Sequence, residues 1–205
     1  MPARLATAAG AALIGADAKE LHQEFRRVLA AVAPQPLRGG EAMGFRELLY
    51  FRVVGCLVEQ GVRLTPEQKR EIFAVFGRQS RPIQGSWLRR EGQLMMRGTV
   101  PLSMDLSTVS QELRYRYRLL QRPQGVVERN PAICSGQPVF SGTRIPVAVV
   151  VEQLRAGVSP TELQEDFPQL SRTALDYAEI QARIPKPPGR PRKALLLQRG
   201  LAPAP

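Results

Sequence analysis

Apolar side chains recur every three or four residues along most of this chain, the spacing that gathers them on one face of an α-helix. Two shorter runs on either side of Glu91-Gly92 suit strands joined by a tight turn. The pattern predicts a mainly α fold with small β-hairpins. The predicted helices lie within residues 4–33 (a pair broken at Gly15), over 45–60, after Thr65 and after Asp105, and the predicted strands lie over 87–90, 93–96 and 100–104.

The stretch of residues 130–184 combines a turn-rich start with three helices. Asn130-Pro131 and two Ser-Gly pairs mark turns, and the extended runs between them, residues 132–134 and 138–140, predict a short hairpin. The helices are expected from Pro146 to a stop at Gly157, from a capping box at Ser159, and from Ser171 to Pro185. Two short helices followed by a longer one form a helix-turn-helix pattern.

Five short motifs follow one another in this stretch: NP at 130–131, SGQPV at 135–139, GTRIPV at 142–147, GVS at 157–159 and FPQL at 167–170. In order and spacing they resemble the domain-of-unknown-function 433 family. The resemblance implies a small helix-turn-helix-like domain. Many members resemble VapB-type antitoxins, which are encoded beside a PIN-like ribonuclease toxin. This copy has Asn130, Ser135 and Gln137 where the family usually has Asp, Gly and Lys, changes that the turns tolerate.

The run FRELLYFRVVGCLVEQGVRLTPEQKREIF, together with the helix pair before it, resembles a MerR-type DNA-binding domain over about residues 4–77. The small residues of the first helix allow the close crossing that a helix-turn-helix requires. The resemblance implies that bases are read from the second helix, although an ordinary αα-hairpin fits the pair nearly as well. The candidate DNA contacts on that helix are Lys19, His22, Gln23, Arg26 and Arg27.

The charge balance favours a polyanionic partner. Twenty-nine Lys and Arg stand against 18 Asp and Glu, a formal net charge of +11, which suits nucleic acid first and an anionic membrane surface second. The helix after Asp105 interleaves tyrosine and arginine, a pattern that could grip phosphate; a solvated helix face is the alternative. The remaining candidate DNA contacts are Arg114, Arg116, Arg118, Arg144 and Arg172.

Residues 185–205 change in composition: they are rich in proline, basic and without acidic side chains, which predicts a flexible tail. Two functions compete for it. The leucines have nothing local to bury against and could fold onto a toxin, whereas GRPRK at 189–193 resembles an AT-hook core that enters the minor groove. The candidate residues are Arg190, Arg192, Lys193, Leu195, Leu196 and Leu197.

Catalytic and metal-binding patterns do not emerge from the sequence. His22 is the only histidine, Cys56 and Cys134 are far apart, and phosphate-binding and nucleophile-elbow motifs are missing. We therefore expect a non-enzyme with no cofactor and no metal. The cysteine usage fits a reducing compartment, and no apolar run approaches the ~20 residues of a membrane span, so we expect a cytoplasmic protein.

Together these features predict two DNA-binding-like modules of helix-turn-helix or winged-helix type, residues 1–80 and 125–184. A hairpin and an arginine-rich helix at 81–124 join them, and the disordered basic tail at 185–205 follows. The predicted function is the antitoxin of a type II toxin–antitoxin system. As a homodimer on operator DNA it would repress its own operon, and it would neutralise a PIN-like ribonuclease toxin from the adjacent gene. The alternative is a stand-alone DNA-binding transcription regulator with an AT-hook-like tail. Asp176 and Glu179 on the last helix of the second module conflict with DNA reading there.

Overall fold

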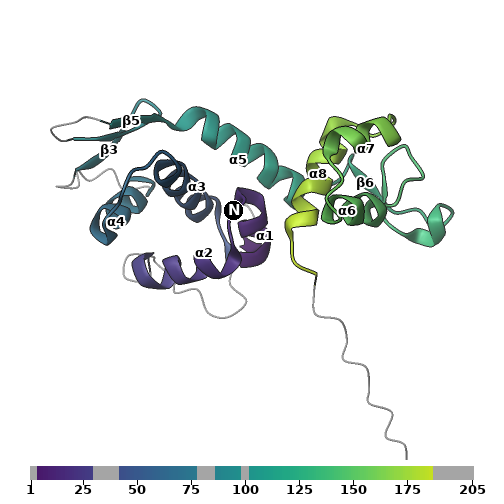
Figure 1. Ribbon diagram of the computed structural model, residues 1–205, viewed down its shortest axis with the longest axis horizontal. Helices are drawn as coiled ribbons and strands as arrows, with labels where there is room; N and C mark the ends of the chain where they lie inside the picture. Colours follow the sequence, from purple (N-terminus) through teal and green to yellow (C-terminus); the bar gives the residue numbers. More distant parts are fainter. Residues whose placement is uncertain (1–3, 30–41, 78–85, 98–101, 187–205) are drawn as a thin grey trace, which may run out of the picture.

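The computed structural model describes residues 4–29, 42–77, 86–97 and 102–186. These residues are mainly helical with small antiparallel sheets, as the hydrophobic pattern predicted. Their buried hydrophobic side chains form two clusters, which belong to the two groups of elements seen in Figure 1. The first cluster belongs to elements up to and including α5, here called the N-terminal part, and the second to the elements after α5, the C-terminal part. The division of the chain into four predicted segments stays a prediction.

The chain opens with a pair of helices joined by a short turn. α1 (Thr7–Ile14) ends at Gly15, which takes the left-handed conformation at φ 74° that glycine adopts without strain. α2 (Ala18–Glu24) begins at Asp17, whose carboxylate accepts hydrogen bonds from the Lys19 and Glu20 amides. A π-helical turn, η1 (Phe25–Leu29), continues α2. The predicted break and cap are therefore confirmed.

Two longer helices follow in the N-terminal part. α3 (Phe45–Glu59) is capped by Glu47, whose carboxylate accepts from the Gly44 amide at 2.8 Å, and α4 (Pro66–Val75) carries the predicted capping box at Thr65. The rings of Tyr50 on α3 and Phe73 on α4 meet edge to face at 5.5 Å. A short antiparallel pair, β1 (Leu5–Ala6) with β2 (Ala42–Met43), joins the start of α1 to the start of α3.

The predicted hairpin and third strand are present as a three-stranded antiparallel sheet. β3 (Trp87–Arg90), β4 (Gln93–Met96) and β5 (Leu102–Asp105) lie in that order. Glu91 and Gly92 form the turn with positive φ values of 50° and 82°. Asp105 then caps α5 (Leu106–Gln121), which packs against α3 and α1.

The predicted hairpin between residues 132–134 and 138–140 is wrong. β7 (Val139–Phe140) pairs instead with β6 (Val127–Glu128), a segment for which the hydrophobic pattern predicts no strand. Cys134, Ser135 and Gly136 form a tight turn, the 3₁₀ segment η2 (Cys134–Gly136), with φ values of 46°, 54° and 77°. A β-strand needs negative φ, so no strand can run through this turn.

The three C-terminal helices begin and end where the caps predicted. They are α6 (Val147–Arg155), α7 (Pro160–Asp166) and α8 (Arg172–Arg183), and the Ser159 and Ser171 side chains cap the last two. α6 and α8 pack side by side. Their buried positions, with Leu163 from α7, Phe140 of β7, Ile145 and Leu170, make the second cluster.

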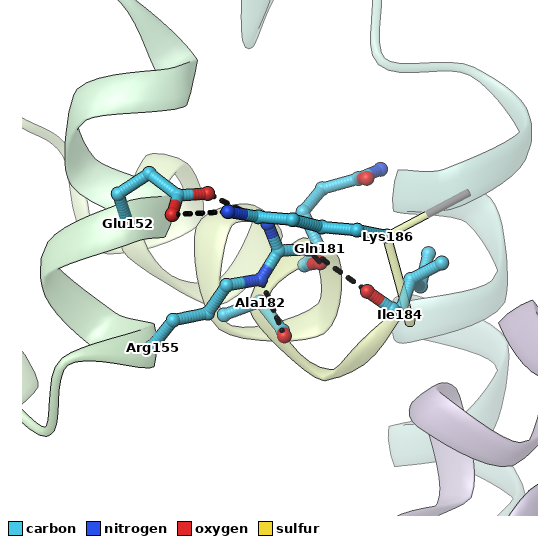
Figure 2. A network of polar contacts seen from close by, with 6 residues as sticks. All are labelled: Glu152, Arg155, Gln181, Ala182, Ile184 and Lys186. Atoms are coloured by element: carbon cyan, nitrogen blue, oxygen red, sulfur yellow. Dashed lines mark hydrogen bonds and ion pairs between the residues drawn. The ribbon is translucent and has the colours of Figure 1, made fainter. Parts of the chain in front are cut away.

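Arg155 of α6 closes the far end of α8 (Figure 2). Its guanidinium donates to the Ala182 carbonyl at 3.1 Å, to the Gln181 carbonyl at 3.2 Å and to the Ile184 carbonyl at 2.8 Å. The last carbonyls of a helix lack donors within the helix, so this side chain supplies them. The Glu152 carboxylate, which bonds Arg155 at 2.7 Å, also binds the Lys186 ammonium group at 2.7 Å.

Candidate nucleic-acid interface

The α2–η1 helix has one buried face and one exposed polar face. Leu21, Phe25 and Val28 point into the first cluster. The opposite face, here called the α2 face, is exposed, and only Glu20 adds an acidic group to it. Arg26 and Arg27 make no ion pair with another residue in the described ranges. The α2 face consists of Lys19, Glu20, Gln23, Arg26 and Arg27, and His22 lies half-buried at its edge.

Contacts on its inner side fix this helix in place. The Glu24 carboxylate forms an ion pair with Lys69 of α4 at 2.8 Å and accepts a hydrogen bond from the Tyr50 hydroxyl at 3.4 Å. Burial, with the Glu24 charge beside it, raises the pKa of Tyr50 well above its usual range. The backbone amides of Glu20 and Lys19 lower the pKa of the Asp17 carboxyl, so the cap is ionised at neutral pH.

Two arginines of α5 are held without losing their charge. The Arg114 guanidinium lies 5.6 Å from the centre of the Phe45 ring, and Arg118 donates to the Arg114 carbonyl at 3.3 Å. Both side chains are exposed. Neither partner is a carboxylate, so the positive charges remain available to an anion.

Arg116 points in another direction. It forms an ion pair with Glu112 at 3.1 Å and donates to the Leu13 carbonyl of α1 at 3.4 Å. There it lines a polar cavity of about 230 Å³ together with Arg52 and Arg183. The interleaved tyrosines also separate, because Tyr117 is buried edge to face against Phe45. The residues of this run therefore do not share one surface.

α8 lies between α6 and the helices of the N-terminal part. It contacts α6 along one side and α5 and α1 along another. Tyr115 of α5 donates to Asp176 at 2.7 Å, and the same carboxylate pairs with Arg172 at 3.1 Å. Within the helix only Arg172 and Arg183, its two end residues, are exposed. α8 therefore offers no continuous free face to a DNA groove.

The structure separates the predicted contacts into distinct sets. α2 and α5 lie on different sides of α1 and α3 (Figure 1), so the α2 face and the α5 arginines are not one surface. Arg144 is exposed in the turn before α6, where its carbonyl accepts from the Cys134 thiol. The predicted tail contacts all fall outside the described residues. They are Arg190, Arg192, Lys193, Leu195, Leu196 and Leu197.

Glu24, Lys69 and Tyr50 were missed by the sequence reasoning. They do not touch the α2 face but position the helix that carries it. These three residues are far apart along the chain and come together only in the folded structure. A charged Glu24 beside the buried stripe of Leu21 and Phe25 was the one available signal, because a charge close to a core needs a partner.

The comparisons with known proteins concern mainly the C-terminal part. Residues 127–178 match the model of a family described as "Protein of unknown function (DUF433)", as the motifs between residues 130 and 170 suggested. No curated protein matches the chain. A solved structure, that of Rv2018 from Mycobacterium tuberculosis, is 16% identical and covers 87% of this chain and 98% of that chain. Its TM-score of 0.31 is too low to support an argument about either part.

Two further observations concern other kinds of site. In the described part of the chain, no helix combines the length and apolarity needed to cross a membrane. Within the same residues, no three His, Cys, Asp or Glu side chains gather as candidate metal ligands.

Proposed function

We propose that this protein is an operator-binding antitoxin, in which α1 and α2 form a helix-turn-helix and the α2 face enters the major groove of DNA. The observation that carries the DNA-binding part is the α2 face itself. It presents three basic side chains, one amide and the single carboxylate of Glu20 on a helix whose opposite face is buried in the core. These side-chain types are the ones that contact phosphates and base edges.

The position of α8 supports assigning DNA recognition to α2 rather than to the C-terminal part. A recognition helix needs a free face along several turns, and α8 is covered by α6 and by α5. Asp176 is occupied by Tyr115 and Arg172 rather than facing a phosphate. Asp176, one of the two acidic residues that conflicted with DNA reading by this helix, is thus accounted for as a contact between the two parts.

The toxin-binding part of the proposal rests on the family match and on the sequence. Residues 127–178 match the model of a family of unknown function. The resemblance carried by the sequence motifs implies that many members of this family are similar to VapB-type antitoxins. The basic, leucine-containing tail is the proposed inhibitory segment, with Arg190, Arg192 and Lys193 directed at the acidic metal site of a PIN-like ribonuclease. As a homodimer, the protein would place two α2 helices on successive half-sites.

Co-expression with the adjacent gene tests the toxin-binding part. The tagged full chain is expected to co-purify with a small nuclease-like protein, as a complex whose mass light scattering gives. Removing residues 185–205 is expected to abolish neutralisation while leaving the far-UV circular dichroism spectrum helical. Neutralisation by the truncated chain would overturn the role of the tail. A lone dimer that binds the upstream DNA and captures no nuclease would favour the stand-alone regulator instead.

A further inference from the structure

Arg114 and Arg118 differ from the other arginines around α5 in what holds them. Arg116 and Arg172 are neutralised by Glu112 and Asp176. Arg114 is held by an aromatic ring and Arg118 by a backbone carbonyl, and among the described residues neither forms an ion pair with a carboxylate. Ordering a guanidinium before binding reduces the entropy lost when it meets a phosphate.

These two residues belong to a row of exposed polar side chains, here called the α5 stripe: Gln111, Arg114 and Arg118. They lie at positions i, i+3 and i+7 of the helix, and Arg122 follows, exposed, at the C-cap. At a rise of 1.5 Å per residue, the Cα atoms of Arg114 and Arg118 are about 6 Å apart along the helix axis. Every member of the row is a hydrogen-bond donor of the kind that contacts the sugar–phosphate backbone.

The stripe does not fit a protein partner as well as it fits phosphate. A protein interface buries an apolar core inside a polar rim. Among the described residues the exposed large hydrophobic side chains are Val58 and Val149, and neither lies on α5. A row of donors with no apolar centre matches a polyanionic backbone instead.

The stripe is also separated from the α2 face, because α1 and α3 lie between the two helices (Figure 1). A straight duplex docked on the α2 face therefore does not reach Arg114 and Arg118. We propose that the α5 stripe is a second phosphate-binding surface, through which one protomer holds a second DNA segment while the α2 face holds the first. This bridging role rests on the proposed function for its first segment, whereas the phosphate binding of the α5 stripe does not.

A bead-capture assay on the full chain tests the bridge. Beads carry a duplex with the sequence upstream of the gene, and capture of a labelled duplex of unrelated sequence is measured through the bound protein. Affinity for the upstream duplex alone is measured separately by fluorescence anisotropy. Arg114→Gln/Arg118→Gln is expected to lower capture about tenfold, because two phosphate contacts are lost. Its affinity for the upstream duplex should stay within about threefold of the original.

Arg89→Gln/Arg97→Gln is the matched control. It removes the same number of positive charges, two, but from the β3–β4 hairpin, and its capture of the labelled duplex is expected to equal that of the unaltered protein. Three results would overturn the bridge: no capture by the unaltered protein, full capture by Arg114→Gln/Arg118→Gln, or an equal loss of upstream-duplex binding in that variant. If Lys19→Gln/Arg26→Gln/Arg27→Gln still binds the upstream duplex while the α5 variant loses capture, the α5 surface is supported and the assignment of α2 fails.

Discussion

Gly10 and Gly55 give the sharpest test of how α1 sits on α3, because the same substitution is expected to have opposite effects. A Cβ atom at Gly10 would lie 2.9 Å from Cδ2 of Leu48 and 3.4 Å from the sulfur of Met43, both fully buried. A Cβ at Gly55, also inside a helix, would meet nothing within 4 Å. Each Gly→Ala change gains helix propensity, but only the first also crowds a packed core.

The magnitudes follow from these two effects. Replacing glycine by alanine inside a helix contributes about 0.5–1 kcal/mol, so Gly55→Ala should be stabilising by that amount. Crowding a packed core costs about 1–3 kcal/mol. Gly10→Ala should therefore be destabilising by about 1 kcal/mol, the crowding cost less the propensity gain. The two variants should then differ by about 1.5–2 kcal/mol.

Urea denaturation of the two variants, followed by circular dichroism, measures this difference. The midpoints should move in opposite directions at an unchanged m-value. A Gly10→Ala protein as stable as Gly55→Ala would refute the close crossing of α1 and α3. The orientation of the α2 face, which follows from that crossing, would then need to be revised.

Three further predictions concern pH and the end of α8. Tyr50 has a raised pKa in the folded state. Its contribution to stability is therefore present below the unfolded pKa near 10 and is lost as pH rises above that value, by about 1.4 kcal/mol per pH unit. Tyr50→Phe should reduce the fall of the urea midpoint between about pH 9 and 11, and an unchanged fall would contradict this. Asp17 has a lowered pKa, so its cap is present above the unfolded value near 4 and is lost as pH falls through the folded value; Asp17→Asn, which still caps, should flatten an acid titration of helicity, whereas an unaltered curve would count against the cap. Arg155→Met should destabilise the C-terminal end of α8 by about 2 kcal/mol and speed hydrogen exchange of its backbone amides. Glu152→Gln keeps the bonds from Arg155 to the carbonyls and should have a smaller effect. Equal exchange in both variants would refute the capping role of Arg155.

Local signals predicted most of the fold. Asp17, Thr65, Asp105, Ser159 and Ser171 each begin a helix because a side-chain oxygen next to an apolar repeat satisfies amides within its own turn. The Glu91-Gly92 pair predicted a turn in the same way, because such a tight turn needs positive φ angles, which glycine adopts readily. Such features depend on residues three or four apart, which a sequence displays directly.

The errors came from contacts between distant segments. β7 chose β6 over the nearer residues 132–134 because the left-handed turn at Cys134–Gly136 removed the local partner. Arg116 and Arg118 are two residues apart, yet one faces α1 and the other solvent. Which side of α5 is covered depends on where α1 and α8 pack, and no pattern along α5 alone contains that information.

The most direct test of the central claim is the salt dependence of DNA binding by the α2 face. Fluorescence anisotropy gives the affinity of the full chain for the upstream duplex across a series of salt concentrations. If the three basic residues each contact a phosphate, Lys19→Gln/Arg26→Gln/Arg27→Gln should lower the slope of log affinity against log salt by about 2.7 in magnitude and weaken binding at every salt concentration. An affinity and a slope equal to those of the unaltered protein would contradict the claim that the α2 face binds DNA.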